Sequence, residues 1–250
     1  MYADGPHIAT RAYEVGDNTL GKERATQFDL GVAWKSAFNS FAFNAYTSNF
    51  KNYIALVQSN GVTRNQADGE VNPVDDPGNP GFSTVTGLDF SPLNEFRYVQ
   101  TRARFTGFEA SGNIRLIEGA SSLDLGLRAD KVQATDLGTG QPLSRIPPMR
   151  LGATLKYASG PFAANVGVDY AAGQTRIPVG DVAAAANTRL NAGVNYRMKA
   201  GGASLLWYAR LDNITNRLAY SATSVLTTTA FPNAPPLPGR SLKLGLQTSF

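Results

Sequence analysis

The sequence predicts an all-β protein built of antiparallel strands, and three features of its 250 residues lead to that prediction. Apolar and polar side chains alternate along many segments, which is the period of a strand with its two faces in different environments. The 25 glycines and 14 prolines supply residues for many turns. The connections between the alternating segments are short and long in turn, which indicates a sheet whose two rims differ.

Nine segments show the alternation. Residues 25–34 place Phe28 and Val32 on one face and Gln27 and Asp29 on the other, and the last segment alternates in the same way. Aromatic residues at several segment ends suit the interfacial girdles of a membrane barrel, although each one alone suits an ordinary core equally well. The expected strands are 25–34, 41–54, 96–116, 121–130, 150–157, 162–170, 188–198, 203–211 and 241–250.

The lengths of the connections favour an antiparallel transmembrane β-barrel with short periplasmic turns and long external loops. The short connections are 35–40, 118–120, 159–161 and 199–202, and the expected external loops lie near 1–24, 56–94, 137–149, 174–187 and 216–240. A soluble antiparallel sheet is the alternative, but strand after strand has a polar face rich in Gly, Arg, Asp and Asn. Because single-chain bacterial barrels have even strand numbers, we expect residues 1–250 to be a portion of a larger barrel, with about nine to ten strands.

Composition excludes several classes of function. The absence of cysteine excludes disulfide scaffolds, thiol chemistry and zinc fingers, and the stretch 218–239 is uncharged but too rich in proline for a membrane helix. With His7 as the single histidine and no phosphate-binding loop, we expect no enzyme activity and no cofactor. The net charge of +4 comes from scattered basic residues, which gives no support for nucleic-acid binding. No signal peptide opens the chain, so we expect any export signal to lie outside this sequence.

Four local motifs resemble the C-terminal part of the barrel of TonB-dependent outer-membrane receptors. Residues 2–10 read YADGPHIAT, and with 13–17 (YEVGD) and 20–23 (LGKE) they are most similar to the branch linked to zinc uptake. Residues 146–151 (IPPMRL) resemble a proline pair before a strand, and 211–216 (LDNITN) with Tyr220 resembles the penultimate-strand motif. Residues 238–241 (PGRS) precede a final strand that stops at Phe250.

The resemblance implies a Gram-negative outer-membrane receptor that takes up a metal or a metal chelate, such as zinc or a ferric siderophore. It also implies that a plug domain and the contact with the TonB energy-coupling complex belong to an N-terminal part missing from this chain. Outer-membrane lipid and the outer-membrane assembly machinery are the other implied partners, and the assembly signal would consist of Lys243, Gly245, Leu246 and Phe250. A passive structural or pore-forming barrel is the alternative function.

Two groups of residues are candidates for ligand contacts. His7, Asp4, Glu14 and Asp17 lie in one segment, where imidazole and carboxylates together could hold a metal such as zinc. The alternative is that Asp4, Gly5 and Pro6 form a turn beside a solvated His7. On the inward face, Arg128, Arg150, Arg189 and Arg197 (with Arg115) could form a basic, ligand-binding lumen for anionic chelates. The alternative is that these arginines pair across strands with carboxylates, of which Asp29, Glu109, Asp124, Asp130 and Asp169 are the candidates.

Overall fold

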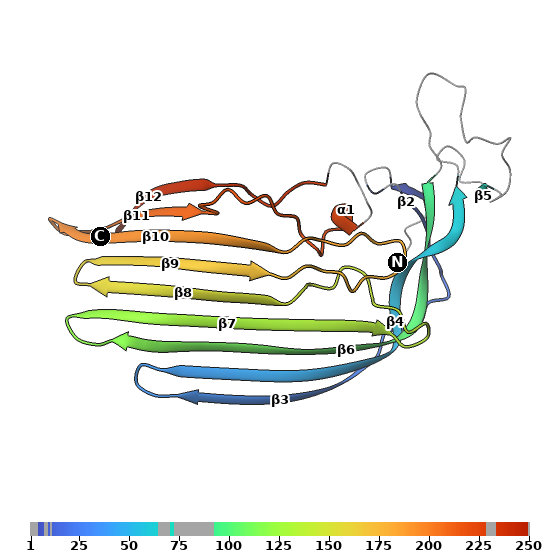
Figure 1. Ribbon diagram of the computed structural model, residues 1–250, viewed down its shortest axis with the longest axis horizontal. Coiled ribbons are helices and arrows are strands. Elements are labelled where there is room, and N and C mark those ends of the chain that lie inside the picture. The colour runs from blue at the N-terminus through green and yellow to red at the C-terminus, as the bar shows by residue number, and fades with distance from the viewer. Residues whose placement is uncertain are drawn as a thin grey trace, which may run out of the picture.

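The computed structural model describes residues 5–7, 10, 12–64, 71–72, 93–228 and 234–249, and these form one large sheet (Figure 1). The short elements are β1 (Gly5–His7), β2 (Ala12–Val15), β5 (Val71–Asn72) and α1 (Val225–Thr228). The long strands are β3 (Ala25–Lys35), β4 (Ser40–Arg64), β6 (Leu93–Ile117), β7 (Ser121–Asp136), β8 (Arg150–Ser159), β9 (Phe162–Ala171), β10 (Asn187–Ala200), β11 (Ala203–Asp212) and β12 (Ser241–Ser249). None of the helices in the described ranges is long and apolar enough to cross a membrane.

The nine long strands are those that the alternating pattern predicts, so the all-β, antiparallel fold class is confirmed. The expected number of strands was too low, because β1, β2 and β5 bring the sheet to twelve within the described residues. These three span only two to four residues each, which is too short for an alternating pattern to be recognised. The segments expected as loops near 1–24 and 216–240 also contain structure, namely β1, β2 and α1.

From β6 to β12 the long strands follow one another in sequence order, each antiparallel to the next, and β3 and β4 extend the sheet beyond β6. Over the described residues β3 pairs only with β4, and β12 only with β11, so these two strands are the edges of an open, curved sheet. Figure 1 shows the short turns gathered at one end and the longer connections at the other. The difference between the rims therefore follows directly from the strand order.

The two faces of the sheet differ as the alternation predicts. On β3, Phe28 and Leu30 are 67% and 68% exposed, and such side chains continue on one face across the sheet. We call this the apolar face; its exposed members include Trp34, Phe41, Ile114, Leu127, Leu151, Val166, Leu190, Val194, Trp207, Leu244 and Leu246. Most charged side chains of the long strands lie on the opposite, polar face. A soluble sheet would bury such an apolar face, so its exposure suits a lipid environment.

Two strands continue well beyond the others at the long-loop end. β4 reaches Arg64 and β6 begins at Leu93, so the segment expected as a loop over 56–94 is strand at both ends. Their pairing is irregular between Phe50 and Tyr53, and Figure 1 shows both strands turning steeply away from the rest of the sheet. We call this part, with β2 beside it, the extension. In the extension, apolar and polar side chains alternate less regularly than in the rest of the sheet. The alternation therefore predicted strands at 41–54 and 96–116 that are shorter than β4 and β6.

The largest cluster of buried apolar residues lies where the extension bends. Ala55, Ala103, Ala134 and Leu143 are buried there, and Phe50, Tyr53, Val99, Phe105 and Ile146 pack against them. Phe50, Tyr53 and Phe105 contact one another edge-on or tilted, with ring centroids 5.3 to 5.5 Å apart. The loop at 137–149 contributes Leu143 and Ile146, so this loop folds against the polar face.

Candidate ligand-binding surfaces

Most arginines proposed for a basic lumen form ion pairs on the polar face. Arg115 Nε lies 2.5 Å from Asp124 Oδ1, and Arg150 Nε lies 2.9 Å from Asp130 Oδ2. Arg128 pairs with Asp169, which also accepts a hydrogen bond from Asn191. Gly152 leaves room for the side chain of Arg128, because a Cβ atom at Gly152 would overlap it.

Arg189 and Arg197 have a different environment. Arg189 lies opposite Asp169 in the register, yet its buried Nε has no hydrogen-bond partner among the described residues. Arg197 is exposed near the short-turn rim. Pairing across strands, one of the two alternatives left open by the sequence, is therefore realised for Arg115, Arg128 and Arg150. A ligand-binding role for the arginines of this face stays a prediction.

The candidate metal ligands are only partly brought together. His7 Nε2 lies 3.8 Å from Glu14 Oε2 across the β1–β2 pair, and Glu14 also accepts a hydrogen bond of 2.7 Å from the Tyr98 hydroxyl. Asp17 instead accepts hydrogen bonds from the backbone and the hydroxyl of Thr19, which lower its pKa. Asp4 lies outside the described residues. Among the residues that the structure describes, no three His, Asp or Glu side chains group as a metal site would require.

The extension contains a buried charged cluster that sequence reasoning missed. Glu95 is 1% exposed, and it accepts hydrogen bonds from Arg64 at 2.5 Å, from Ser59 at 2.7 Å and from Arg97. The guanidinium of Arg64 also lies over the Tyr13 ring of β2, 5.2 Å from its centroid. Burial acts to raise the pKa of Glu95, but the hydrogen bonds from Arg97, Ser59 and Arg64 outweigh it and lower the pKa to about 2.

A cavity of about 360 Å³ lies in the bend between the extension and two loops. Tyr53, Leu56, Phe96 and Val99 line it from the strands; Leu143, Arg145, Pro178 and Asp181 line it from the loops. The Oε1 atom of Gln58 lies close enough to Gly180 that only a residue without a Cβ fits there, so the second loop contacts β4. The cavity thus depends on contacts between segments far apart in the sequence.

The polar side chains of this cavity differ in the hydrogen bonds and ion pairs that they form. The Ser144 hydroxyl donates to Asp181 Oδ2 at 2.5 Å, and burial raises the pKa of the Asp181 carboxyl. Asp136 already accepts hydrogen bonds from Thr101 at 2.5 Å and from the Gly138 backbone at 2.7 Å. Arg145 is exposed, has a left-handed backbone with φ of 60°, and forms no ion pair with a described carboxylate. Its guanidinium is the cation of this cavity that is available to a ligand.

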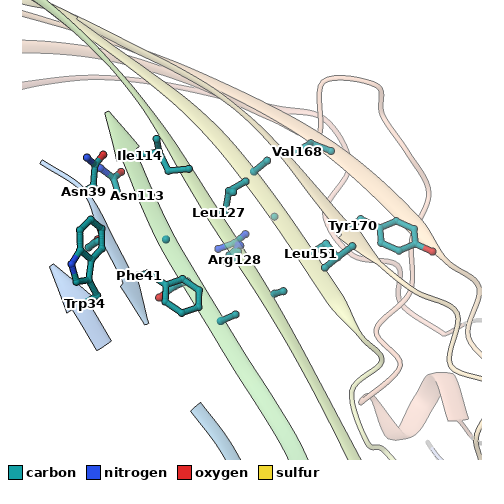
Figure 2. A pocket seen from close by; sticks show the side chains of 17 residues that line it. Trp34, Asn39, Phe41, Asn113, Ile114, Leu127, Arg128, Leu151, Val168 and Tyr170 are labelled. Carbon is teal, nitrogen blue, oxygen red and sulfur yellow. The ribbon is translucent and has the colours of Figure 1, made fainter. Parts of the chain in front are cut away.

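A larger hollow, of about 590 Å³, lies on the apolar face (Figure 2). Trp34, Phe41, Leu127, Leu151 and Tyr170 surround it, contributed by five different strands. Its floor consists of small residues, Ala110, Gly112, Ala129 and Ala153, which the register places in two adjacent rows. Such walls suit hydrocarbon rather than a polar ligand.

The last hairpin shows how the proposed assembly-signal residues are placed. Lys243 lies opposite Arg210 and Gly245 opposite Tyr208, while Leu246 is 47% exposed on the apolar face. The ring of Tyr208 occupies the space where a side chain at position 245 would begin. Phe250 lies outside the described residues, and the role of all four residues in assembly stays a prediction.

Beside this hairpin, the motif at 211–216 joins neighbouring segments through the hydrogen bonds of Asn213. Asn213 is buried, has a φ of 48°, and its amide donates to the carbonyls of Arg217 at 2.9 Å and Pro238 at 3.2 Å. Its own backbone N–H donates to Asn191 Oδ1 at 3.0 Å. Asparagine tolerates the left-handed region and offers both donors and an acceptor, which explains this residue type here.

An open antiparallel sheet with an exposed apolar face, a charged opposite face and unequal rims defines the class of outer-membrane β-barrel proteins. Residues 1–215 match the family described as "TonB dependent receptor-like, beta-barrel", and the chain belongs to this family. The link to the zinc-uptake branch is not confirmed by this match.

Solved structures share the fold. The chain is 16% identical to the copper transporter OprC with a TM-score of 0.70, covering 93% of this chain and 32% of that one. The chain is also 16% identical to a variant of the ferric enterobactin receptor PfeA from Pseudomonas aeruginosa, with a TM-score of 0.62, covering 95% of this chain and 32% of that one. It is 14% identical to the iron transporter FrpB from Neisseria meningitidis, with a TM-score of 0.58, covering 96% of this chain and 33% of that one. The chain thus spans about a third of the length of these proteins.

Proposed function

We propose that the chain forms part of an outer-membrane receptor that takes up a metal or a metal chelate by TonB-dependent transport. The family match supports the receptor class, and the similar structures named for copper, ferric enterobactin and iron transport support a metal-containing ligand and not an enzyme. An active receptor would need the TonB complex, reached through a part that this chain does not include. The exposed apolar face supports contact with outer-membrane lipid.

The observation that carries the choice of ligand is the cavity in the bend of the extension. It is lined by residues of the long-loop end, the side from which a ligand would arrive in a receptor, and it combines the aromatic side chains of Tyr53 and Phe96 with the cation of Arg145. The two carboxylates of the cavity already accept hydrogen bonds, Asp181 from Ser144 and Asp136 from Thr101 and the Gly138 backbone, whereas Arg145 forms no ion pair with a described carboxylate. An anionic chelate with aromatic groups, such as a ferric catecholate siderophore, fits this combination better than a bare cation does.

Zinc is the second candidate, and it depends on His7 and Glu14. Their 3.8 Å separation lets both contact one ion after a small movement, with Asp4 and Asp17 as further candidate ligands from the same segment. Two donors fall short of the four ligands usual for zinc, so this site would need ligands from elsewhere. The chelate is therefore the favoured ligand.

The experiment compares Arg145→Gln with the parent protein assembled in membranes, using a ferric tris-catecholate and Zn²⁺ as probes. Loss of one charge-assisted hydrogen bond should weaken chelate binding about tenfold or more and leave zinc binding unchanged. Arg217→Gln, an exposed arginine of another loop, is the matched control. Uptake should stop when the proton-motive force is removed, whereas a passive pore would keep admitting small solutes. Equal chelate affinity for Arg145→Gln and Arg217→Gln would exclude the cavity as the binding site.

A further inference from the structure

Five basic residues lie toward the long-loop rim on the apolar face of four neighbouring strands, or directly beside it. Within a strand, alternate residues share a face, so Arg102 and Arg104 lie opposite the side of β6 on which Ala103 and Phe105 are buried. Lys131 follows Leu127 and Ala129 on the same face of β7. We call five residues the basic rim: Arg24, Lys51, Arg102, Arg104 and Lys131.

The register brings these residues close together. Arg104 lies opposite Asn49, and its Nε donates to the Asn49 side chain at 2.9 Å. Lys51, two residues farther along β4, donates its backbone N–H to the Arg24 carbonyl at 2.9 Å. Four of the five side chains are exposed, and Lys131 is partly exposed. Arg24, Lys51, Arg102 and Arg104 therefore form one surface, and Lys131 lies two rows farther toward the short-turn rim, opposite Phe108.

Negative charge is separated from this surface. The positions of β3, β4, β6 and β7 that face the same way carry no Asp or Glu in the described residues, while Asp29, Glu109, Asp124 and Asp130 all lie on the polar face. None of the five cations forms an ion pair with a described carboxylate. Glu23 is the nearest acidic residue in sequence, and its Oε1 accepts a hydrogen bond from the Ile54 backbone at 2.7 Å.

Below the basic rim, the same strands become apolar in a fixed order. Thr26 lies in the row of Arg104, and the next row toward the short-turn rim holds Phe28, Thr47 and Thr106. The two rows after it hold Leu30 with Phe108 and then Val32 with Phe43. The hollow of Figure 2 lies farther along the same face. On β8 to β11 the apolar face reaches the long-loop rim with Leu151, Tyr170, Thr188 and Leu211, so the cations belong to one sector of the sheet.

We propose that the basic rim binds the phosphate groups of a lipid in the membrane leaflet on the long-loop side, while the acyl chains of that lipid lie along the apolar face below. Cations beside a membrane attract anionic headgroups, and the adjoining threonine hydroxyls and hydrocarbon surface match the order of groups in such a lipid. A soluble anion would gain nothing from the apolar surface. This inference depends on the membrane location of the barrel and not on the ligand that is transported.

The test uses the membrane-assembled protein, extracted in a non-ionic detergent and titrated with diphosphorylated lipid A, with native mass spectrometry as the measurement. The double variant Lys51→Gln with Arg104→Gln should bind this lipid about 30-fold more weakly, since each cation near a charged membrane surface contributes about a fivefold factor. Lys35→Gln with Lys199→Gln removes the same charge from exposed positions at the short-turn rim and should leave binding unchanged. Lys51→Arg with Arg104→Lys, which keeps the charge, should also retain it.

Three results would overturn the proposal. The first is an equal loss of lipid in the two charge-removing variants. The second is unchanged binding when lipid A lacks its phosphates, because the cations would then have no partner. The third is competition by free inorganic phosphate or by a soluble polyanion as strong as that by the lipid, which would show that the acyl chains contribute nothing. Comparing the heat-modified electrophoretic mobility of all variants separates a loss of lipid from a failure to assemble.

Discussion

The regular part of the sheet and the extension differ in what holds them together. In the regular part, β7 to β12 pair without interruption, many apolar side chains are exposed, and no cluster of large residues is buried among the residues that the structure describes. At the base of the extension, β4, β6, β7 and the loop at 137–149 form a small core, and farther out β4 and β6 hold a buried carboxylate beside β2. In the proposed membrane location, lipid takes the place of a core in the regular part, whereas the extension, outside the bilayer, would need a core of its own.

This difference means that the two regions should respond to different mutations. A charge on the apolar face should disrupt the regular part, where that face would contact lipid, and matter little in the extension, which lies beyond it. Loss of a buried polar contact should do the opposite, because such contacts are few in the regular part and central to the extension. The following predictions test this difference, beginning with the largest expected effect.

Replacing Glu95 by Ala should destabilise the extension by about 3–5 kcal/mol, because it leaves Arg64 and Arg97 without their shared buried partner. Hydrogen exchange of the amides at 93–100 measures this directly, and exchange in β8 and β9 should not change. Asp212→Ala is the matched control, since its partner Arg210 is 64% exposed and such pairs contribute about 0–1 kcal/mol. Similar protection of 93–100 in both variants would show that the buried cluster is not what stabilises the extension.

The same contacts should make the extension sensitive to acid. The pKa of Glu95 is lowered from 4.5 to about 2, so its ionised form is favoured in the folded state. The stabilisation is therefore fully present above the unfolded pKa and is lost as the pH falls from that value through the folded pKa. We expect the protection factors of the amides at 93–100, which relate the measured exchange rates to the intrinsic ones at the same pH, to fall between pH 4.5 and about 2 in the parent and to show no such change in Glu95→Ala. A parallel profile in the two proteins would assign the acid sensitivity to other groups.

In the regular part, Val194→Arg should cost about 2–4 kcal/mol when the position lies near the centre of the bilayer, because it places a cation against lipid. Asn195→Arg, on the opposite face of the same strand, should cost much less. The yield of folded protein in lipid vesicles at increasing urea concentration gives both values. Equal destabilisation by the two substitutions would contradict the assignment of the two faces.

These two regions also show what a single sequence can and cannot predict. The faces of β3 or β10 follow from a local period of two, so the nine long strands could be found without any tertiary information. Glu95 gave no such signal, because its partners Ser59 and Arg64 lie more than 30 residues away and meet it only through the pairing of β4 with β6. The same holds for the cavity around Arg145. The motif at 211–216 could be recognised in the sequence, but the hydrogen bonds of Asn213 to residues 217 and 238 follow only from the fold.

A smaller effect is expected at Gly245, where the face on which the residue lies does not by itself predict the cost of a substitution. This position lies on the polar face, where an alanine would normally be tolerated, yet a Cβ atom there would overlap the Tyr208 ring. We expect Gly245→Ala to destabilise the last hairpin by about 1 kcal/mol because the ring must move. In a Tyr208→Ala background the same substitution should cost nothing, so a double-mutant cycle in urea measures the coupling. Additive costs would show that the ring and the glycine do not interact.

The smallest expected structural effect belongs to His7, which is 48% exposed beside Glu14 at the end of the short β1–β2 pair. Replacing it by Ala should leave the unfolding of both regions unchanged, since the pair is exposed and contributes little stability. If His7 and Glu14 contribute ligands to a zinc ion, titration calorimetry of the membrane-assembled protein should show zinc affinity reduced by about tenfold or more, or about 1.4 kcal/mol. Asn18→Ala, an exposed neighbour that provides neither imidazole nor carboxylate, is the control. The same zinc affinity for parent, His7→Ala and Asn18→Ala would exclude His7 as a ligand and leave the Arg145 cavity as the candidate site for a chelate.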